Sequence, residues 1–379
     1  MTLDELDTPS LILDRPVLAR NVAAMTRRAR ALGVSLRPHM KTAKSVDVAR
    51  LALQGNAGGI TVSTLKEAEY FAAAGFKDIV YAVSMVPSKL PRVAALRRAG
   101  VDIAVVADRV DVAQALSERC LQLDLDDLPI LIELDTGEQR GGVSPRSRAL
   151  VELGELLHRL PGLSLRGVLT HAGHSYAGRS IEEMQAIAEH ERAASVAAAG
   201  RLRAAGLPCP VVSVGSTPTA VHARHLEGVT ELRCGVYMFG DVFQCSIGSC
   251  GNGDIAVSVL ATVIGHRKDI DCAVIDAGAL ALSKDRSTAA AGLPEDVGFG
   301  LVTDAAGHER IRDMHVSRVY QEHGLVSCRG EFPFAQLPVG ARVRVFPNHV
   351  CLTAAMYDTY QVIDGGNELV AAWPRVNGW

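Results

Sequence analysis

The sequence predicts an α/β protein made of a TIM-like (β/α)8 barrel and a smaller, mainly antiparallel β domain. Between about residues 15 and 240, short apolar runs rich in β-branched residues alternate with longer Ala-, Leu- and Arg-rich segments of helical period. After about residue 250, short strand-like runs follow one another between Gly, Pro, Asp and Asn turns. The 379 residues leave room for a second domain beside a barrel of about 250 residues.

The first part of the chain contains eight expected strands and seven expected helices. The strands are 34–37, 59–63, 78–82, 102–107, 129–133, 165–170, 210–214 and 230–234. The helices are 16–31, 45–53, 64–74, 88–98, 110–121, 145–159 and 181–205. This alternation favours a closed barrel of parallel strands, and an open Rossmann-like sheet is the competing prediction.

The second part contains strand-like runs with little helical period. They are 255–264, 272–276, 300–302, 342–346 and 361–363. Residues 11–14 form another such run, and we expect it to pair with these strands because the barrel already has eight. The predicted domains are therefore a barrel over 15–245 and a β domain over 246–379 that includes an N-terminal strand within 1–14.

The composition argues against several classes of function. Lys and Arg total 39, Asp and Glu total 42, and aromatic residues make up 4%, so the basic and aromatic surface of a nucleic-acid-binding protein is not expected. No apolar run reaches the ~18 to 20 residues that span a bilayer, and the acidic amino terminus lacks the apolar core of a signal peptide. The eight cysteines form no C-x-x-C pair. We expect a cytoplasmic protein that binds neither nucleic acid nor membrane.

Lys41 follows the first expected strand, within Arg-Pro-His-Met-Lys. Alternation along the strand places Arg37, His39 and Lys41 on one face, and barrels carry their reactive groups at the carboxyl ends of strands. A lysine there is either a solvated or ion-paired charge, or a reactive amine that forms a Schiff base.

The segments 213–219 and 233–237 follow the last two expected barrel strands. Barrels commonly bind phosphate after strands seven and eight, and the Gly-Ser-Thr loop that opens a helix at Pro218 offers hydroxyl groups and backbone N–H groups. An ordinary capped turn is the alternative.

His349 and Cys351 stand two residues apart in Pro-Asn-His-Val-Cys. On an extended segment their side chains share a face, so an imidazole and a thiolate can hold one cation, and the soft sulfur favours zinc. Two ligands leave coordination positions open for a Lewis-acid role. A histidine and a cysteine of the core are the alternative.

Five ordered motifs carry a resemblance over nearly the whole chain. They are Leu-Arg-Pro-His-Met-Lys-Thr-Ala-Lys-Ser, Thr-Val-Ser-Thr-Leu-Lys-Glu-Ala-Glu, Val-Ser-Val-Gly-Ser-Thr-Pro-Thr, Gln-Glu-His-Gly and Pro-Asn-His-Val-Cys. In this order they resemble the D-threonine aldolase and D-serine dehydratase group of fold-type III pyridoxal phosphate enzymes. The longest shared stretches are with members that act on D-threo-3-hydroxyaspartate. The resemblance implies an alanine racemase-like barrel.

The resemblance also implies roles for particular residues. Lys41 matches the lysine that carries pyridoxal phosphate, and His349 and Cys351 match the metal ligands, with zinc in first place and manganese, cobalt or magnesium as other candidates. The residues matching the rest of the cofactor site are Gly215, Ser216, Thr217, Gly235 and Tyr237 around the phosphate, Arg140 near the phenolic oxygen, and Tyr176 in the pocket.

Other polar residues receive weaker predictions. His39, Gln321 and His323 are the candidates for substrate contact, and Glu322 belongs to the same motif as the last two. His171 and His174 follow the sixth strand and could reach the site or serve only as hydrogen-bonding residues. The residues Asp276, Gly278, Lys284, Asp285 and Arg286 are expected to be structural or to form the rim.

The His-x-Cys pair favours dehydration, because D-threonine aldolases of this group carry His-x-Asp at that place. The resemblance therefore implies a dehydratase that converts β-hydroxy-D-amino acids, such as 3-hydroxy-D-aspartate or D-serine, into a 2-oxo acid and ammonia. A retro-aldol lyase that releases glycine and an aldehyde is the alternative, and a racemase or a noncatalytic pyridoxal phosphate carrier is less favoured. By the same analogy we expect a homodimer.

Overall fold

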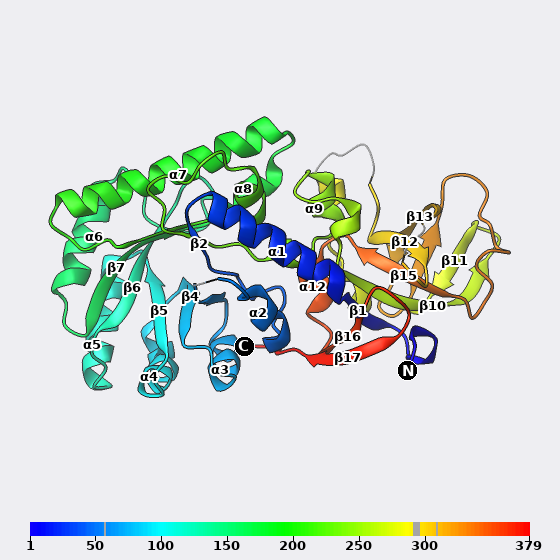
Figure 1. Cartoon of the computed structure of the whole chain (residues 1–379), viewed down its shortest axis with the longest axis horizontal. Helices are drawn as coiled ribbons and strands as arrows, with labels where there is room; N and C mark the ends of the chain where they lie inside the picture. The colour runs from blue at the N-terminus through cyan, green and yellow to red at the C-terminus, as the bar shows by residue number, and fades with distance from the viewer. Residues whose placement is uncertain (57, 291–295, 308–309) are drawn as a thin grey trace. The chain divides into compact units, whose positions relative to one another are not determined.

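The computed structural model describes residues 1–56, 58–290, 296–307 and 310–379. The chain divides into two compact units (Figure 1). The barrel unit comprises Ala24–Gly235 with Gly378–Trp379, and the β unit comprises Met1–Ala23 with Val236–Asn377.

The barrel unit contains one sheet of eight parallel strands in the order β2-β9-β8-β7-β6-β5-β4-β3. The strands are β2 (Ser35–Leu36), β3 (Ile60–Val62), β4 (Asp78–Ser84), β5 (Asp102–Ala107), β6 (Leu128–Leu134), β7 (Leu163–Thr170), β8 (Val211–Val214) and β9 (Glu231–Leu232). The backbone N–H of Met40 donates to the Thr61 carbonyl (2.8 Å), and that of Thr61 donates to the Pro38 carbonyl (2.9 Å). These bonds join the two ends of the sheet, so the predicted barrel is confirmed and the open sheet is excluded.

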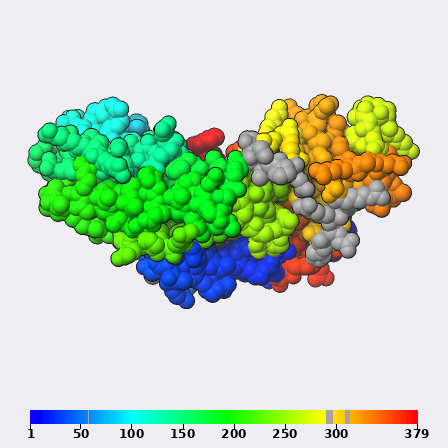
Figure 2. Space-filling model, turned by 90° about the horizontal axis from the view of Figure 1, so that it is seen from above, coloured from blue at the N-terminus to red at the C-terminus, as the bar shows by residue number. Residues whose placement is uncertain are grey.

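Helices connect these strands and lie outside them (Figure 1). They are α2 (Val46–Ala52), α3 (Leu65–Ala73), α4 (Leu90–Arg98), α5 (Val110–Gln122), α6 (Arg148–Arg159), α7 (Ile181–Ala204) and α8 (Thr217–His222), with short 3-10 turns η2 (Pro87–Lys89) and η3 (Gly173–Ala177). The helix α1 (Arg15–Ala31) precedes β2, and its residues up to Ala23 belong to the β unit. The helix α6 illustrates their sequence pattern, since Leu150, Leu153 and Leu157 recur at helical spacing and are buried. The helix α7 lies at the surface of the barrel unit, where it is green in Figure 2.

The β unit contains a nine-stranded sheet in the order β11-β14-β13-β12-β15-β10-β1-β16-β17. The strands are β1 (Ser10–Asp14), β10 (Val257–Arg267), β11 (Cys272–Ile275), β12 (Gly300–Asp304), β13 (Arg310–Val319), β14 (Gly324–Ser327), β15 (Arg342–Pro347), β16 (Thr359–Ile363) and β17 (Leu369–Pro374). Its short helices are η1 (Leu3–Glu5), η4 (Val236–Met238), α9 (Val242–Ser246), η5 (Asn252–Asp254), α10 (Ala279–Leu282), α11 (Ser287–Ala290) and α12 (Val350–Ala354). As predicted, residues 11–14 join this sheet. They pair antiparallel with β10 and parallel with β16.

Three strands of the β unit, β13, β14 and β17, were not expected from the sequence. In β13 polar residues alternate with apolar ones, and only the apolar Met314 and Val316 are fully buried in its central part. An antiparallel strand with one face in water needs no continuous apolar run, so it lacks the signal by which the other strands were recognised. Within the described ranges, no helix is long and apolar enough to cross a membrane.

Candidate active site

Lys41 lies at the carboxyl end of the barrel's first strand. The backbone N–H of His39 still donates to the Cys234 carbonyl (2.8 Å), so the chain leaves the sheet just before Lys41. The Lys41 side chain is exposed, and its backbone N–H donates to Nδ1 of His39 (3.3 Å). Among the residues that the structure describes, its amine forms no ion pair. Lys41 therefore presents a primary amine at the end of the barrel where this fold performs chemistry.

Two uncharged imidazoles belong to the same group of side chains. Burial lowers the pKa of His39 well below its ordinary value, and the positive charges of Lys41 and Arg233 lower it further. Burial, with the charge of Lys41, also lowers the pKa of His171 to about 3. Nδ1 of His171 lies 2.9 Å from the Gly215 carbonyl oxygen, which can only accept a hydrogen bond. Nδ1 of His171 therefore donates, and Nε2 carries the lone pair.

The lowered pKa of His171 predicts a loss of stability in mild acid. Well above pH 6.5 this residue is neutral in both states; as the pH falls through 6.5 towards 3, the unfolded chain binds a proton that the folded chain does not. Between about pH 7.5 and about pH 5.5 the expected loss from this residue is about 1.4 kcal/mol. The free energy of unfolding is measured with denaturant at both pH values. Between them, His171→Gln should lose about 1.4 kcal/mol less than the unchanged protein loses. An equal loss in both proteins would contradict the assignment.

A buried polar network, not foreseen from the sequence, extends through the barrel. Arg233 follows β9, is 4% exposed, and donates to Ser213 Oγ (3.0 Å) and to the Thr170 carbonyl (2.7 Å). Ser213 in turn donates to Glu231 (2.5 Å), which also pairs with Arg37 (2.7 Å). The guanidinium of Arg233 is thus fixed beneath the strand ends and contributes positive charge near His39 and His171.

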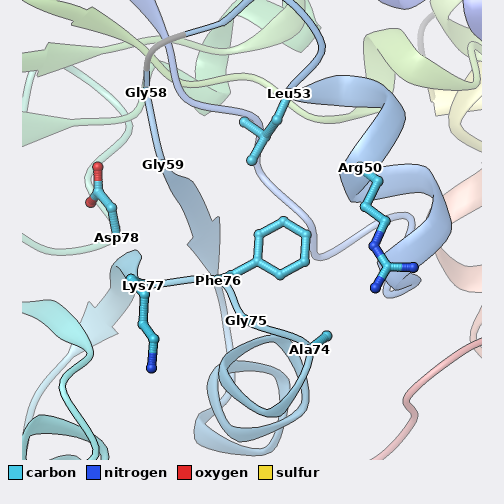
Figure 3. Close-up of a pocket in the computed structure, with 9 residues that line it drawn as sticks. All are labelled: Arg50, Leu53, Gly58, Gly59, Ala74, Gly75, Phe76, Lys77 and Asp78. Atoms are coloured by element: carbon cyan, nitrogen blue, oxygen red, sulfur yellow. The ribbon is translucent and has the colours of Figure 1, made fainter.

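Arg37 has a different position from the one that strand alternation suggested. Its guanidinium pairs with Asp78 (2.7 Å), the first residue of β4, as well as with Glu231, the first residue of β9. These are the amino ends of the strands, so Arg37 stabilises the end of the barrel opposite Lys41. A cavity of about 380 Å³ lies at this same end, between Arg50, Gly59 and Asp78 (Figure 3), and it is separate from the Lys41 group.

The loop between β8 and α8, the candidate phosphate loop, has the capped geometry of the alternative interpretation. Ser216 caps α8 by accepting the N–H of Thr219, and its backbone N–H donates to the Thr219 hydroxyl (3.0 Å). Gly215 has φ +134°, and a Cβ there would lie 2.5 Å from the Arg233 carbonyl oxygen, so only glycine fits. The Ser216 hydroxyl also lies 2.7 Å from that of Ser175.

Glu191 of α7 holds this loop in place and was also missed from the sequence. It is 2% exposed, and its Oε1 accepts the N–H groups of Ala172 (3.1 Å) and Gly215 (2.9 Å). Burial raises its pKa to about 6. Glu191 stands in a helix without a motif around it, and only the packing of α7 against the strand ends shows its role.

The other predicted cofactor residues of the barrel unit lie on loops at the carboxyl ends of strands. Arg140 follows β6, is exposed, and pairs with Glu138 (3.2 Å) and Glu133 (3.8 Å). Tyr176 lies in η3 after β7, half-buried, with its ring centre 6.4 Å from that of His171. A Cβ at Gly235 would lie 2.5 Å from the His39 carbonyl oxygen. The buried Thr217 begins α8 in this unit, and the buried Tyr237 lies in η4 of the β unit.

His349 and Cys351 lie in the β unit, at the start of α12. The expectation of an extended segment is wrong, because only His349 is extended and Cys351 stands in the first turn of the helix. The helix starts here because Asp241 Oδ2 accepts the N–H of Val350 (3.0 Å), one of the N–H groups that a helix leaves without an internal partner.

Asp241 also fixes the ring of His349, and it is a functional candidate that the sequence did not reveal. It is fully buried, and its Oδ2 lies 3.1 Å from His349 Nδ1. Burial lowers the pKa of His349, but Cys351 and Asp241 outweigh it and raise the pKa to about 11. With Nδ1 turned to a carboxylate, Nε2 is the nitrogen that would exchange its proton for a metal, the arrangement that metal-binding histidines commonly show. Across the described part of the chain, no three His, Cys, Asp or Glu side chains form a complete metal cluster.

Gln321 and His323 occupy the exposed turn between β13 and β14 of the β unit. Gln321 donates through its side chain to Glu322 (3.3 Å). The backbone of this turn packs on Gly278, where a Cβ would lie 2.5 Å from the Gln321 carbonyl oxygen. Gly278 is therefore required for close packing.

The remaining candidates have contacts that are structural. Asp276 accepts the N–H of Thr262 (2.8 Å) and the Thr8 hydroxyl, which ties the N-terminal segment to the sheet. The acidic and basic residues that follow α10 are engaged locally, since Asp285 accepts from Ser287 and Arg286 pairs with Asp296. His174 lies against Gly137, where a Cβ would come within 3.2 Å of its ring.

Comparison with known protein families covers both parts of the chain. Residues 13–242 match the family model described as alanine racemase, N-terminal domain, and residues 256–363 match that of a serine dehydratase domain.

Three curated relatives match nearly the full length. D-threo-3-hydroxyaspartate dehydratase of Delftia sp. (strain HT23) is 47% identical over 383 residues, covering 100% of this chain and 99% of the relative. D-serine dehydratase of Dictyostelium discoideum is 29% identical (100% and 98% covered), and D-threonine aldolase of Arthrobacter sp is 31% identical (96% and 91% covered). The solved structure of the Delftia enzyme covers both chains fully with a TM-score of 0.95. These matches confirm the resemblance found in the sequence motifs, and the chain belongs to the family that joins an alanine racemase N-terminal domain to a serine dehydratase domain.

Proposed function

We propose that this protein is a pyridoxal phosphate- and divalent metal-dependent dehydratase of β-hydroxy-D-amino acids, such as D-threo-3-hydroxyaspartate or D-serine, and that it releases a 2-oxo acid and ammonia. The observation that carries the proposal is the 47% identity, over the whole chain, with a dehydratase, against 31% with a D-threonine aldolase. In this proposal the barrel domain, 15–245, holds the cofactor, and the β domain, 246–379 with 1–14, holds the metal.

The Lys41 group fits pyridoxal phosphate. The cofactor needs a primary amine for its aldehyde and donors for its phosphate, and the barrel unit supplies Lys41 and the hydroxyl-rich loop at Ser216 and Thr217. When bound, pyridoxal phosphate draws electrons from the α carbon of an amino acid and so makes its proton removable. We assign contacts with the phosphate to Gly215, Ser216, Thr217, Gly235 and Tyr237, with the phenolic oxygen to Arg140, and with the pocket wall to Tyr176.

Lys41 is the residue we assign to the removal of the substrate's α proton, through Nζ. An amine accepts a proton only in its neutral form. The neighbouring His39 and His171 are uncharged, because burial lowers their pKa values below the ordinary value. We assign His39 to substrate contact, together with Gln321 and His323 of the β unit.

His349 and Cys351 fit a soft divalent cation. Asp241 holds Nδ1 of the imidazole, which leaves Nε2 and the Cys351 sulfur as donors, and this donor set favours zinc over manganese, cobalt or magnesium. A cation held there would act as a Lewis acid towards the β-hydroxyl, a poor leaving group by itself. A cysteine-to-alanine variant of D-threo-3-hydroxyaspartate dehydratase is known in a metal-free form, which supports a metal in this family.

Replacement of Asp241 by asparagine should weaken metal binding by about 10- to 100-fold, because the carboxylate that lies 3.1 Å from Nδ1 becomes a neutral amide. The amide oxygen can still cap α9, where Asp241 now accepts the N–H of Gln244 (2.7 Å). Metal affinity is measured by competition with a chelating dye. The control is Asp254→Asn, a nearby carboxylate that caps only Gly251 (2.8 Å). Equal affinities in the two variants would exclude this role for Asp241.

A retro-aldol lyase is the second candidate, and the 31% identity with a D-threonine aldolase is the observation that favours it. One experiment separates the two functions. The protein, supplied with pyridoxal phosphate and zinc, is incubated with D-threo-3-hydroxyaspartate, D-serine and D-threonine, and ammonia, 2-oxo acid and glycine are assayed. Ammonia with an equal amount of 2-oxo acid supports the dehydratase. Glycine with an aldehyde would show that the protein is an aldolase and not a dehydratase.

We also propose that the protein is a homodimer. Light scattering of the same preparation tests this.

A further inference from the structure

Two cysteines of the β unit lie side by side outside the residues assigned above. Cys245 lies in α9, and Cys250 follows it by five residues. The chain reverses between them: the N–H of Gly248 (φ +74°) donates to the Cys245 carbonyl (3.0 Å), and the N–H of Ser249 donates to the Gln244 carbonyl (2.9 Å). As a result the two sulfurs are 3.4 Å apart, and both side chains are half-buried.

We propose that Cys245 and Cys250 form an oxidation site that closes into an intramolecular disulfide when the protein meets a hydroperoxide. A disulfide has an S–S length of about 2.05 Å, so the sulfurs must approach by roughly 1.4 Å, a distance that side-chain rotation and a small loop shift can supply.

The reaction balances in two steps. One sulfur attacks the peroxide oxygen; the O–O bond breaks, an alcohol or water leaves, and the sulfur becomes a sulfenic acid. The second sulfur then attacks this oxidised sulfur, an S–S bond forms, and water leaves with the remaining proton. The two thiols lose two electrons and the hydroperoxide gains them.

The surroundings of Cys245 disfavour its thiolate form. The hydrogen bond with Cys250, followed by burial, raises the pKa of Cys245, and the negative charges of Asp241 and Asp254 act in the same direction. The thiolate is the nucleophile, so these surroundings slow attack by Cys245. The 3.4 Å separation lets either sulfur resolve a sulfenic acid formed on the other.

The pair is connected to the anchor of His349. A Cβ placed on Gly240 would lie 3.2 Å from the Cys250 sulfur, so this sulfur rests against the residue that precedes Asp241. Asp241 caps α9, the helix that carries Cys245, and its other oxygen faces His349. Closing the disulfide shifts Cys245 within α9 and Cys250 beside Gly240, and therefore the residues on both sides of the Asp241 cap. The consequence for metal binding rests on the proposed function, whereas disulfide formation does not.

The first test is chemical and independent of activity. The full-length protein is treated with hydrogen peroxide at increasing ratios, the remaining thiols are alkylated, and peptides are mapped by mass spectrometry. We expect a peptide joined through Cys245 and Cys250, lost on reduction with dithiothreitol, before Cys328 is oxidised. Oxidation of Cys328 first, or independent oxidation of Cys245 and Cys250 without a bridge, would overturn the proposal.

Single variants test the sulfenic acid step. In Cys245→Ser and in Cys250→Ser, a sulfenic acid should accumulate on the remaining thiol of the pair and be trapped by a dimedone probe severalfold more than in the unchanged protein, because the thiol that resolves it is gone. No gain of label in either variant would overturn the proposal. Both variants should retain the turnover of the unchanged protein, and Cys328→Ser, which removes another half-buried thiol, serves as the matched control.

The coupling to His349 is tested by metal retention. Zinc-loaded protein, oxidised to the disulfide, is dialysed against a weak chelator, and the metal left is measured by atomic absorption. We expect oxidised protein to lose zinc severalfold faster than reduced protein, and oxidised Cys250→Ser to lose it no faster. Equal retention by disulfide-containing and reduced protein would refute the coupling. Failure to bind zinc in either form would instead count against the proposed function.

Discussion

Replacement of Lys41 by alanine is expected to lower turnover of β-hydroxy-D-amino acids by at least about three orders of magnitude, because a positioned acid or base alone contributes about 10²- to 10⁴-fold. The variant also loses the amine that would hold pyridoxal phosphate, so its visible absorption should disappear. Both effects follow from the position of Lys41 after the last backbone pairing of the first barrel strand, with His39 and His171 in the same group. Absorption spectra and an ammonia assay measure them.

Lys44 provides the matched control for this experiment. It stands three residues further along, but its amine lies 3.3 Å from Glu67 Oε1 and is committed to that ion pair. Lys44→Ala should retain the absorption band while losing some stability, since the buried Glu67 is left without its partner. If Lys44→Ala loses the band and Lys41→Ala keeps it, the assignment of Lys41 is wrong.

Removal of the metal is the second change with a large expected effect. Lewis-acid stabilisation of a leaving oxygen contributes several kcal/mol, and each 1.36 kcal/mol is a factor of ten, so chelation should lower turnover by about three orders of magnitude. Zinc added back should restore it. His349→Ala should behave like the chelated protein and should not recover with zinc, because the nitrogen donor beside Asp241 is gone.

The outcome that contradicts the metal prediction is full turnover in excess chelator. The His349→Ala variant must also keep its pyridoxal phosphate absorption, because the residues assigned to the aldehyde and most of those assigned to the phosphate belong to the barrel unit. A variant that loses both absorption and activity would point to misfolding. Its far-UV circular dichroism and unfolding midpoint should then be compared with those of Asp254→Asn.

Much of the barrel could be predicted because its strands are buried on both faces. The range 102–107 agrees with β5, and 165–170 lies within β7, since such strands read as continuous apolar runs between helical segments. In the β unit the same signal found β10 and β15 but missed β13 and β17, in which one face meets water.

The candidate site shows a similar division. Lys41, Ser216 and His349 stand in compact motifs, so their neighbours along the chain reveal them. Glu191 and Asp241 stand in no motif, and their partners are distant in the sequence. Glu191 accepts hydrogen bonds from the backbone at 172 and 215, and Asp241 lies against the ring of His349.

The sequence by itself determined the order of the eight barrel strands, the amine at Lys41 and the nearness of an imidazole and a thiol at 349 and 351. Only the tertiary structure decided that Arg37 serves the amino end of the barrel, that Cys351 begins a helix, and that Asp241 orients His349. The physical reason is that backbone pattern and local motifs act over a few residues, whereas the partner of a buried charge or an unpaired N–H group is set by which distant segments the fold brings within about 3 Å.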